Sequence, residues 1–197
     1  MVGPAIGVLA LQGDFDAHRR LLEAEGAAVR EIRRCRGLDA VQGLVLPGGE
    51  STALLKLMED EPWLEAIRAF HARGGALLGT CAGAILLARR VVPDQPSIGL
   101  LDVTVARNAY GRQRDSFETA VETAAGLAPL SGMFIRAPRI LGCGPGVEVL
   151  ARFRGEPVAV REGRVIAATF HPEIAGTAAL HRHWLGLAGH TADRDVA

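Results

Sequence analysis

Hydrophobic and polar positions alternate with two different periods in the first half of the chain. Four short runs predict strands, over residues 6–11, 28–32, 43–46 and 75–78. Segments in which apolar side chains recur every three or four positions predict helices, over about residues 14–25, 52–59 and 62–72. This alternation of strands and helices predicts a parallel sheet with right-handed crossovers and with helices on both faces.

The pattern changes after Arg90, where short strand-like runs follow one another with turn residues between them. They predict strands, over about residues 101–106, 117–122, 133–136, 147–153, 157–161 and 164–170. A closing helix is predicted over about residues 177–187. We expect the additional strands to extend the same sheet in an antiparallel or mixed manner, so the predicted fold class is α/β.

Length and charge narrow the class of protein. With 197 residues and 49% hydrophobic content, the chain is long enough to bury one sizeable core. We expect a single domain over residues 1–189 and a flexible polar tail over residues 190–197. The 22 basic residues balance the 22 acidic ones, so no net charge attracts nucleic acid or an anionic membrane. A small-molecule substrate fits this balance.

The cysteines and the apolar stretches bear on the cellular compartment. Cys35, Cys81 and Cys143 are an odd number without CxxC spacing, which argues against a disulfide framework or a zinc site and favours a reducing cytoplasm. The longest uncharged stretch, residues 74–88, is too short to span a bilayer, and the N-terminus lacks the pattern of an export signal. We therefore expect a cytoplasmic protein, in which Cys35 and Cys143 are structural or incidental.

The most informative segment is 79–83, with the sequence Gly-Thr-Cys-Ala-Gly between two apolar runs. A strand, a tight turn of small residues around one nucleophile and a helix start form an elbow that displays the side chain of Cys81. We expect the glycines to permit a strained backbone and to leave room for a substrate carbonyl. The helix start favours the thiolate. The alternative is a buried cysteine that acts as a small hydrophobe.

A base for this thiol is offered by residues 171–173, His-Pro-Glu, at the end of the last predicted strand. Strand ends on one edge of an α/β sheet converge on a common crevice. Pro172 biases His171 toward an extended conformation, so the carboxylate of Glu173 can hold the imidazole. We predict a triad in which Cys81 is the nucleophile, His171 the base and Glu173 the orienting group. The alternative for His171 is a structural histidine at a strand end.

A second turn with catalytic potential is formed by residues 47–51, Pro-Gly-Gly-Glu-Ser. Its two glycines allow backbone N–H groups to face an oxyanion, and Gly48, Gly49 and Ala82 are the candidate oxyanion-hole residues. The spacing is not that of a phosphate-binding loop, because no lysine follows until Lys56. The alternative is a plain strand-to-helix turn with Ser51 as the helix N-cap.

These motifs together resemble the class I glutamine amidotransferase family. The segments that carry the resemblance lie at 6–13, 46–52, 79–83 and 170–173. Within that family the chain resembles the glutaminase subunits of pyridoxal 5′-phosphate synthases, the PdxT type. The more selective segments for this type lie at 11–13, 47–52, 107–113, 115–118 and 134–138. The resemblance runs from Ile6 to about Glu173, and it implies a three-layer fold with a mostly parallel central sheet.

The resemblance implies hydrolysis of L-glutamine to L-glutamate and ammonia by the triad of Cys81, His171 and Glu173. The ammonia would pass to a synthase subunit of the PdxS type, which builds pyridoxal phosphate from pentose and triose phosphates, in a hetero-oligomeric complex. No cofactor is expected. The positions that match the family's glutamine-binding residues are Gly49, Glu50, Ser51, Arg107, Ile135 and Arg136.

The charged members of this set suit a zwitterionic amino acid. Arg107 or Arg136 would bind the α-carboxylate and Glu50 the α-ammonium group. Outside the motif, both arginines would be interpreted as solvated surface residues. Gln12 lies where the family has a residue near the synthase interface and the active site.

Three alternatives remain open for the function. They are a glutaminase subunit of another class I amidotransferase, a non-catalytic regulatory or binding module on the same fold, and a different thiol hydrolase or stress protein with a cysteine elbow. The complete triad argues against the second, and the motifs at 47–51 and 171–173 argue against the third.

Few positions depart from the family pattern. Tyr110 stands where the family commonly has Phe, and residues 174–180 lack the charged side chains often found there. His181, His183 and His190 suggest a metal site at first sight. Residues two apart on a helix face different ways, so we interpret them as part of a solvated helix and tail, with no metal site.

Overall fold

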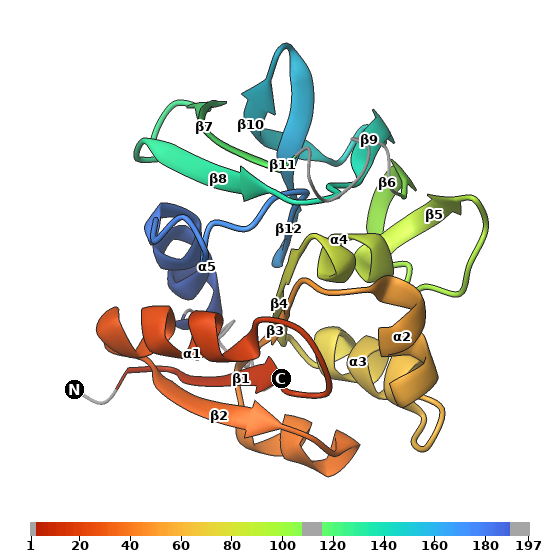
Figure 1. Cartoon of the computed structure of the whole chain (residues 1–197). Coiled ribbons are helices and arrows are strands. Elements are labelled where there is room, and N and C mark those ends of the chain that lie inside the picture. Colours follow the sequence, from red (N-terminus) through yellow and green to blue (C-terminus); the bar gives the residue numbers. More distant parts are fainter. Residues whose placement is uncertain (1–2, 108–115, 190–197) are drawn as a thin grey trace, which may run out of the picture.

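The computed structural model describes residues 3–107 and 116–189, and its middle layer is a nine-stranded sheet (Figure 1). In spatial order the strands are β2 (Ala28–Ile32), β1 (Ala5–Leu9), β3 (Gly43–Leu46), β4 (Ala76–Thr80), β12 (Val165–Ala168), β11 (Glu156–Glu162), β10 (Glu148–Phe153), β7 (Phe117–Thr123) and β8 (Leu130–Phe134). The strands from β2 to β12 run parallel, and those from β12 to β8 pair antiparallel. The predicted α/β class with an antiparallel extension is confirmed.

The prediction of one continuous sheet is wrong for residues 101–106. This stretch is β6 (Leu101–Ala106), and it lies in a second sheet between β5 (Ala88–Val92) and β9 (Arg139–Cys143). Alternate residues of β6 are buried because its inner face packs on the helical layer beside the main sheet. Sequence analysis did not predict β5, because the apolar run after Cys81 reads as continuous helix, and it did not predict β9.

Helices cover both faces of the main sheet, as predicted (Figure 1). On one side lie α1 (Phe15–Ala24) and α5 (Ala179–Gly189). On the other lie α2 (Ser51–Leu57), α3 (Trp63–Ala72) and α4 (Ala82–Leu87). A 3₁₀ helix over Cys35–Ala40 precedes β3 and was not predicted.

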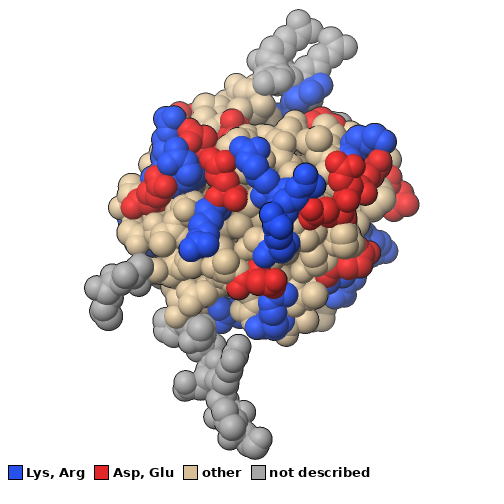
Figure 2. Space-filling model, turned by 90° about the horizontal axis from the view of Figure 1, so that it is seen from below, with Lys and Arg blue, Asp and Glu red and all other residues tan. Residues whose placement is uncertain are grey.

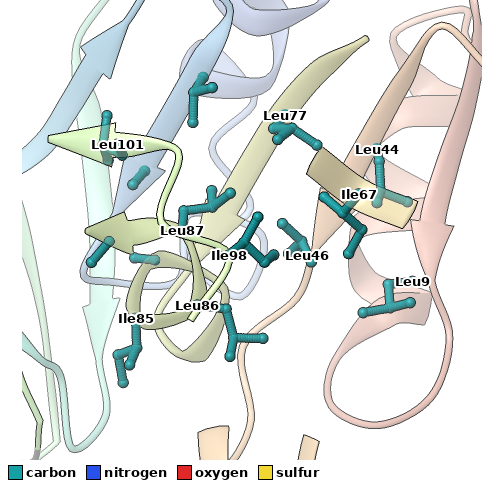
Figure 3. Packing of buried hydrophobic residues seen from close by; sticks show 14 of the residues in the cluster. Leu9, Leu44, Leu46, Ile67, Leu77, Ile85, Leu86, Leu87, Ile98 and Leu101 are labelled. Carbon is teal, nitrogen blue, oxygen red and sulfur yellow. The ribbon is translucent and has the colours of Figure 1, made fainter. Parts of the chain in front are cut away.

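The two faces of the sheet are built by side chains that alternate along each central strand. Leu44 and Leu77 join the cluster that packs against α2, α3 and α4 (Figure 3), whereas Val45 and Leu78 join the cluster under α1 and α5. All four side chains are fully buried, and each contributes about 1.5–3 kcal/mol of hydrophobic stabilisation. Strands buried on both faces explain the uninterrupted apolar runs of the sequence.

Charged groups of both signs are interspersed on the molecular face shown in Figure 2. Surface pairs such as Arg19 with Glu23 join opposite charges one helical turn apart. None of the helices that the structure describes is long and apolar enough to cross a membrane. The single domain ending at residue 189 stays a prediction. The predicted tail and the motif residues 108–113, with Tyr110 and His190, lie outside the described residues.

Candidate active site

Cys81 stands at the turn between β4 and α4, with φ 48° and ψ −102°. A residue with a Cβ rarely adopts a positive φ, so the backbone is strained at the candidate nucleophile itself. The Cys81 amide donates a hydrogen bond of 2.8 Å to the Ala168 carbonyl, which ties the turn to the end of β12. The structure thus aims the thiol at the crevice beyond the parallel strand ends.

The glycines on either side of Cys81 have a different role from the one predicted, since neither has a positive φ. A Cβ on Gly79 would lie 2.6 Å from the carbonyl group of Gly83, and a Cβ on Gly83 would lie 2.0 Å from the Leu46 carbonyl oxygen. They therefore allow α4 to begin in direct contact with β3 and β4. The predicted backbone strain falls on Cys81 itself, and close packing is what requires glycine at positions 79 and 83.

His171 is fixed through its backbone and its ring. Its amide donates to the Met133 carbonyl at 2.8 Å, and the Met133 amide donates back at 3.3 Å, so β8 holds the residue in place. Its Nδ1 lies 2.7 Å from Oε1 of Glu173, and both side chains are almost fully buried. Because Nδ1 donates to this carboxylate, Nε2 is the ring nitrogen left to interact with the sulfur of Cys81. The thiol also lies 3.9 Å from the Ile135 carbonyl oxygen.

The two buried charges of the His171–Glu173 pair stabilise each other. Burial lowers the pKa of His171, but the hydrogen bonds and charges of Cys81 and Glu173 outweigh it and raise this pKa to about 10. Burial raises the pKa of Glu173, but the neighbouring His18 imidazole and the hydrogen bond from His171 hold it well below its usual range. At neutral pH the pair is an imidazolium and a carboxylate, so His171 carries a proton that it can donate.

This pair predicts a pH dependence of stability. The Glu173 contribution is present above its unfolded pKa of 4.5 and is lost as the pH falls toward its depressed folded pKa. The His171 contribution is complete below 6.5 and is lost as the pH rises through about 10. We expect the difference in unfolding free energy between wild type and Glu173→Gln to be largest at about pH 4.5–6.5 and to shrink toward pH 10, as measured by denaturant unfolding.

Asp39→Asn provides the matched control for this measurement. Asp39 is an exposed carboxylate that pairs with Arg73 at 2.9 Å, and such surface pairs contribute little. The Asp39 variant is expected to unfold like wild type at every pH. A Glu173→Gln difference that stays constant from pH 5 to pH 10 contradicts the assigned charge states.

A pocket of about 280 Å³ opens at Cys81 and His171. It is also lined by all six residues predicted to bind glutamine, Gly49, Glu50, Ser51, Arg107, Ile135 and Arg136. Gln12 lines it as well, and so do Asp14 and Ile85, which sequence analysis did not name. Asp14 starts the predicted helix over 14–25 and Ile85 belongs to the apolar run after Cys81, but neither pattern shows which residue faces the crevice.

Glu50 begins α2 in the way an N-cap residue does. Its carboxylate accepts hydrogen bonds from the amides of Thr52 at 3.3 Å and Ala53 at 2.9 Å. The alternative of Ser51 as the N-cap is wrong, since Ser51 is already the first helical residue and its hydroxyl donates to Gln95. Hydrogen bonds from Thr52, from its hydroxyl first, and the charge of Arg107 lower the pKa of Glu50. The carboxylate therefore stays negative at the pocket wall.

The turn before Glu50 packs against both the base and the loop of Gln12. A Cβ on Gly48 would lie 2.1 Å from Cε1 of His171, so the imidazole rests directly on the Gly48 backbone. Gly49 has φ 143°, and Gly13, with φ 90°, lies so close that a Cβ there would be 1.7 Å from the Gly48 carbonyl oxygen. Only glycine fits these three positions.

Gln12 and Ala82 complete the set of predicted site residues. The side-chain oxygen of Gln12 is buried and has no hydrogen-bond partner within the part of the chain that the structure describes. It lies 3.3 Å from the point where a Cβ on Gly49 would stand. Ala82 is the first residue of α4 and is fully buried beside Cys81. The oxyanion-hole role of Gly48, Gly49 and Ala82 stays a prediction.

Two histidines that were not predicted to belong to the site lie behind the triad. His18 of α1 and His181 of α5 are fully buried, so the prediction of a solvated surface is wrong for His181. His18 Nε2 lies 3.3 Å from Glu173 Oε1 and 3.1 Å from the Thr80 hydroxyl, and His18 Nδ1 lies 2.8 Å from His181 Nε2. The helical pattern of the sequence could have indicated their burial, because each histidine falls on the apolar side of its helix.

The remaining candidate ligands were also located. Asp14, His171 and Glu173 bring three potential metal-ligand atoms within 4.8 Å of one another, although the last two already bond each other. Cys35 and Cys143 lie outside the pocket. Burial first, with the Glu61 carboxylate, raises the pKa of Cys35 to about 12, and burial also raises the pKa of Cys143. Both therefore favour the thiol form over the nucleophilic thiolate.

Comparison with known proteins decides the family, since a model of the SNO glutamine amidotransferase family matches residues 8–185. The chain belongs to this family. A Deinococcus radiodurans protein named pyridoxal 5′-phosphate synthase subunit PdxT is 50% identical over 193 residues, which cover 95% of this chain and 98% of that protein. A Thermus thermophilus protein of the same name is 49% identical and is covered to 97%, with 93% of this chain aligned.

Solved structures agree with the membership in the SNO glutamine amidotransferase family. One described as a glutamine amidotransferase is 47% identical, with a TM-score of 0.88 over 94% of this chain and 99% of that chain. The structure of PurLQS from Thermotoga maritima is 15% identical, with a TM-score of 0.67 over 95% of this chain and 97% of that chain. The second similarity shows the shared fold alone. The predicted resemblance to the family and its PdxT type is confirmed.

Proposed function

We propose that this chain is the glutaminase subunit of a pyridoxal 5′-phosphate synthase. It hydrolyses L-glutamine to L-glutamate and ammonia and delivers the ammonia to a PdxS-type synthase subunit. One observation carries the chemistry, namely that Cys81, His171 and Glu173 are in sequential contact at a pocket with charged walls. The relatives named as synthase subunits PdxT support the pathway.

The pocket walls suit the two charges of an amino acid. Arg107 and Arg136 line the pocket, and a guanidinium can bind the α-carboxylate through two parallel hydrogen bonds. The Nε of Arg107 is buried without a hydrogen-bond partner within residues 3–107 and 116–189, which favours a bound anion. Glu50 stays ionised at the same wall and can accept from the α-ammonium group. The side-chain amide then points toward Cys81.

The first half of the reaction forms a thioester. The Cys81 thiolate adds to the amide carbon of glutamine, and the carbonyl oxygen becomes an oxyanion next to the turn of Gly48 and Gly49. When this tetrahedral species collapses, the C–N bond breaks and His171 gives its Nε2 proton to the departing nitrogen. Ammonia leaves, the γ-glutamyl group stays on sulfur, and His171 becomes neutral.

The second half of the reaction returns the enzyme to its starting state. Water adds to the thioester carbon while His171 accepts one of its protons at Nε2. Collapse of the second tetrahedral species breaks the C–S bond, which releases the γ-carboxylic acid of glutamate and regenerates the thiolate and the imidazolium. The acid proton passes to solvent or to ammonia. Glu173 holds Nδ1–H throughout, so the same tautomer serves both steps.

Transfer of labelled nitrogen tests this function. The chain is incubated with the synthase subunit of the same organism, pentose and triose phosphates, and L-glutamine labelled with ¹⁵N in the side-chain amide. We expect the label in the ring nitrogen of pyridoxal phosphate and an equal amount of glutamate, measured by mass spectrometry. The synthase subunit supplied with ¹⁵N-ammonium but no glutaminase is the control. If glutamate forms without labelled pyridoxal phosphate, delivery of ammonia is excluded. If neither glutamate nor labelled pyridoxal phosphate forms, the glutaminase activity is excluded.

A further inference from the structure

The triad does not end at Glu173 but continues into a buried polar cluster made of His18, Thr80 and His181. These residues come from α1, β4 and α5, and all three are fully buried. Figure 1 shows α1 and α5 on the same side of the sheet, and the 2.8 Å contact between His18 Nδ1 and His181 Nε2 joins the two helices. None of the three lines the pocket, so none of them contacts a bound substrate.

The cluster lies among large, mostly apolar side chains. Leu22 on α1 and Leu180 and Trp184 on α5 belong to the same hydrophobic cluster under the sheet. A pair of buried imidazoles in such surroundings costs free energy unless each nitrogen is hydrogen-bonded. Packing alone therefore does not explain why two histidines are buried here, whereas the contact of His18 with Glu173 does.

The protons of the cluster can be assigned from its contacts. Burial lowers the pKa of His181 to about 3, so this imidazole is neutral and carries one N–H. Its Nδ1 has no partner among the residues described, whereas its Nε2 faces His18. An unpaired lone pair is tolerated better than an unpaired N–H, so Nε2–H donates to His18 Nδ1. His18 then carries its proton at Nε2, 3.3 Å from Glu173 Oε1.

This assignment gives a single direction of donation toward the catalytic carboxylate. Glu173 Oε1 lies 2.7 Å from Nδ1 of His171 on one side and 3.3 Å from Nε2 of His18 on the other. His18 Nε2 also lies 3.1 Å from the hydroxyl of Thr80, the residue before Cys81. One imidazole is therefore in contact with both arms of the site, the strand that carries the nucleophile and the segment that carries the base.

We propose that His18, backed by His181, is a positioning residue that fixes the Glu173 carboxylate and thereby the orientation of the His171 imidazole. The proposal rests on the proposed glutaminase function and extends it to a residue that does not contact glutamine. His18 contacts Glu173 and His181 through its two ring nitrogens, and both partners lie outside α1. Because His18 is not a member of the triad, its substitution removes the second donor of the carboxylate and leaves all three triad residues in place.

The test compares two substitutions of His18 in the full chain docked on the synthase. His18→Gln keeps a donor to Glu173, because the amide nitrogen lies as many bonds beyond Cβ as Nε2 does, whereas His18→Leu removes it. We expect His18→Leu to lower kcat about 10–100-fold, by analogy with loss of the outer hydrogen-bond partner of a metal-ligating histidine. We expect KM for glutamine to change less than about twofold, and His18→Gln to recover most of kcat.

Two combined variants separate positioning from general damage. If His18 acts through Glu173, then Glu173→Gln with His18→Leu has the same kcat as Glu173→Gln alone, because the residue that His18 positions is already lost. His181→Leu, which acts through His18, is expected to have a smaller effect than His18→Leu. His71→Gln is the matched control, since His71 is also hydrogen-bonded but lies on α3, with its Nδ1 2.9 Å from the Gly75 carbonyl.

A readout without glutamine makes the test independent of the proposed function. The Nδ1–H of His171 is expected to give a downfield proton resonance that is lost or shifted in His18→Leu and retained in His18→Gln and His71→Gln. Thermal unfolding verifies that each variant is folded. If folded His18→Leu keeps the wild-type resonance and kcat, or if its loss of kcat adds fully to that of Glu173→Gln, the proposal is wrong. Absence of glutaminase in wild type contradicts the proposed function instead, and the resonance still decides the positioning.

Discussion

Replacement of Cys81 by alanine is expected to remove glutamine hydrolysis almost completely, with kcat at least about 10⁴-fold below wild type. Loss of the nucleophile from a triad has cost about 10⁶-fold in kcat in a well-studied case. His171→Asn is expected to be nearly as severe, because both proton transfers need a base worth about 10²–10⁴-fold. Glu173→Gln keeps the hydrogen-bonding shape of the side chain and is expected to leave measurable turnover. Glutamate release by each variant, docked on the synthase, is the measurement.

The other two cysteines provide matched controls for the nucleophile. Cys35→Ala and Cys143→Ala are expected to keep wild-type turnover, since both thiols lie outside the pocket. A glutamine-like affinity label followed by peptide mapping is expected to mark Cys81 alone, as a covalent adduct in which the sulfur has displaced the leaving group of the label. Labelling of Cys35 or Cys143 by the same reagent, or persistent activity of Cys81→Ala, rules out the assigned nucleophile. Near-normal turnover of His171→Asn points to a different base.

Three strands agree with the predicted ranges to the residue, namely β2, β3 and β6. They differ in burial, since β3 is buried throughout, β6 is buried at alternate residues and β2 is mostly exposed. Where one apolar run serves two elements, as after Cys81, the boundary follows from tertiary contacts. Ala88 leaves α4 with ψ 142° and starts β5. No local sequence pattern marks the end of α4 at this residue.

The sequence predicted the catalytic residues of the site better than the buried residues that support them. The triad residues stand in compact motifs, and both motifs end at the same edge of the sheet, so their meeting follows from topology. His18 and His181 lie 163 positions apart, and their contact depends on how two helices pack on one face. The need for glycine at positions 79 and 83 comes from the close approach of α4 to β3 and β4, which no local pattern reveals.

The isolated chain is expected to be a poor glutaminase that becomes active on its synthase partner, with glutamate production rising about 10²–10³-fold. That factor corresponds to one oxyanion-hole donor. The peptide between Gly48 and Gly49 can supply such a donor only when its N–H faces the oxyanion. In the structure the Gly48 carbonyl oxygen packs against Gly13, so the loop of Gln12 sets the orientation of this peptide.

Docking near Gln12 would therefore act on the catalytic turn directly. A shift of the loop changes the contact between Gly13 and Gly48 and selects one of two peptide orientations, which is a population shift. A reorientation of the peptide rotates φ of Gly49, now 143°, through a range that only glycine spans freely. Such a device withholds ammonia until an acceptor is bound.

Gly49→Ala tests this mechanism because a Cβ restricts the turn to one orientation. We expect the rise in glutamate production on addition of synthase to be much smaller than in wild type, while the affinity for the synthase stays the same. Gly48→Ala is unsuitable, since its methyl group would displace the His171 imidazole and lower the rate in both states. Gly74→Ala is the matched control, because Gly74 also has a positive φ of 96° but lies in open space. Equal glutaminase rates of wild type with and without saturating synthase would refute the switch, and the assignment of the triad would stand.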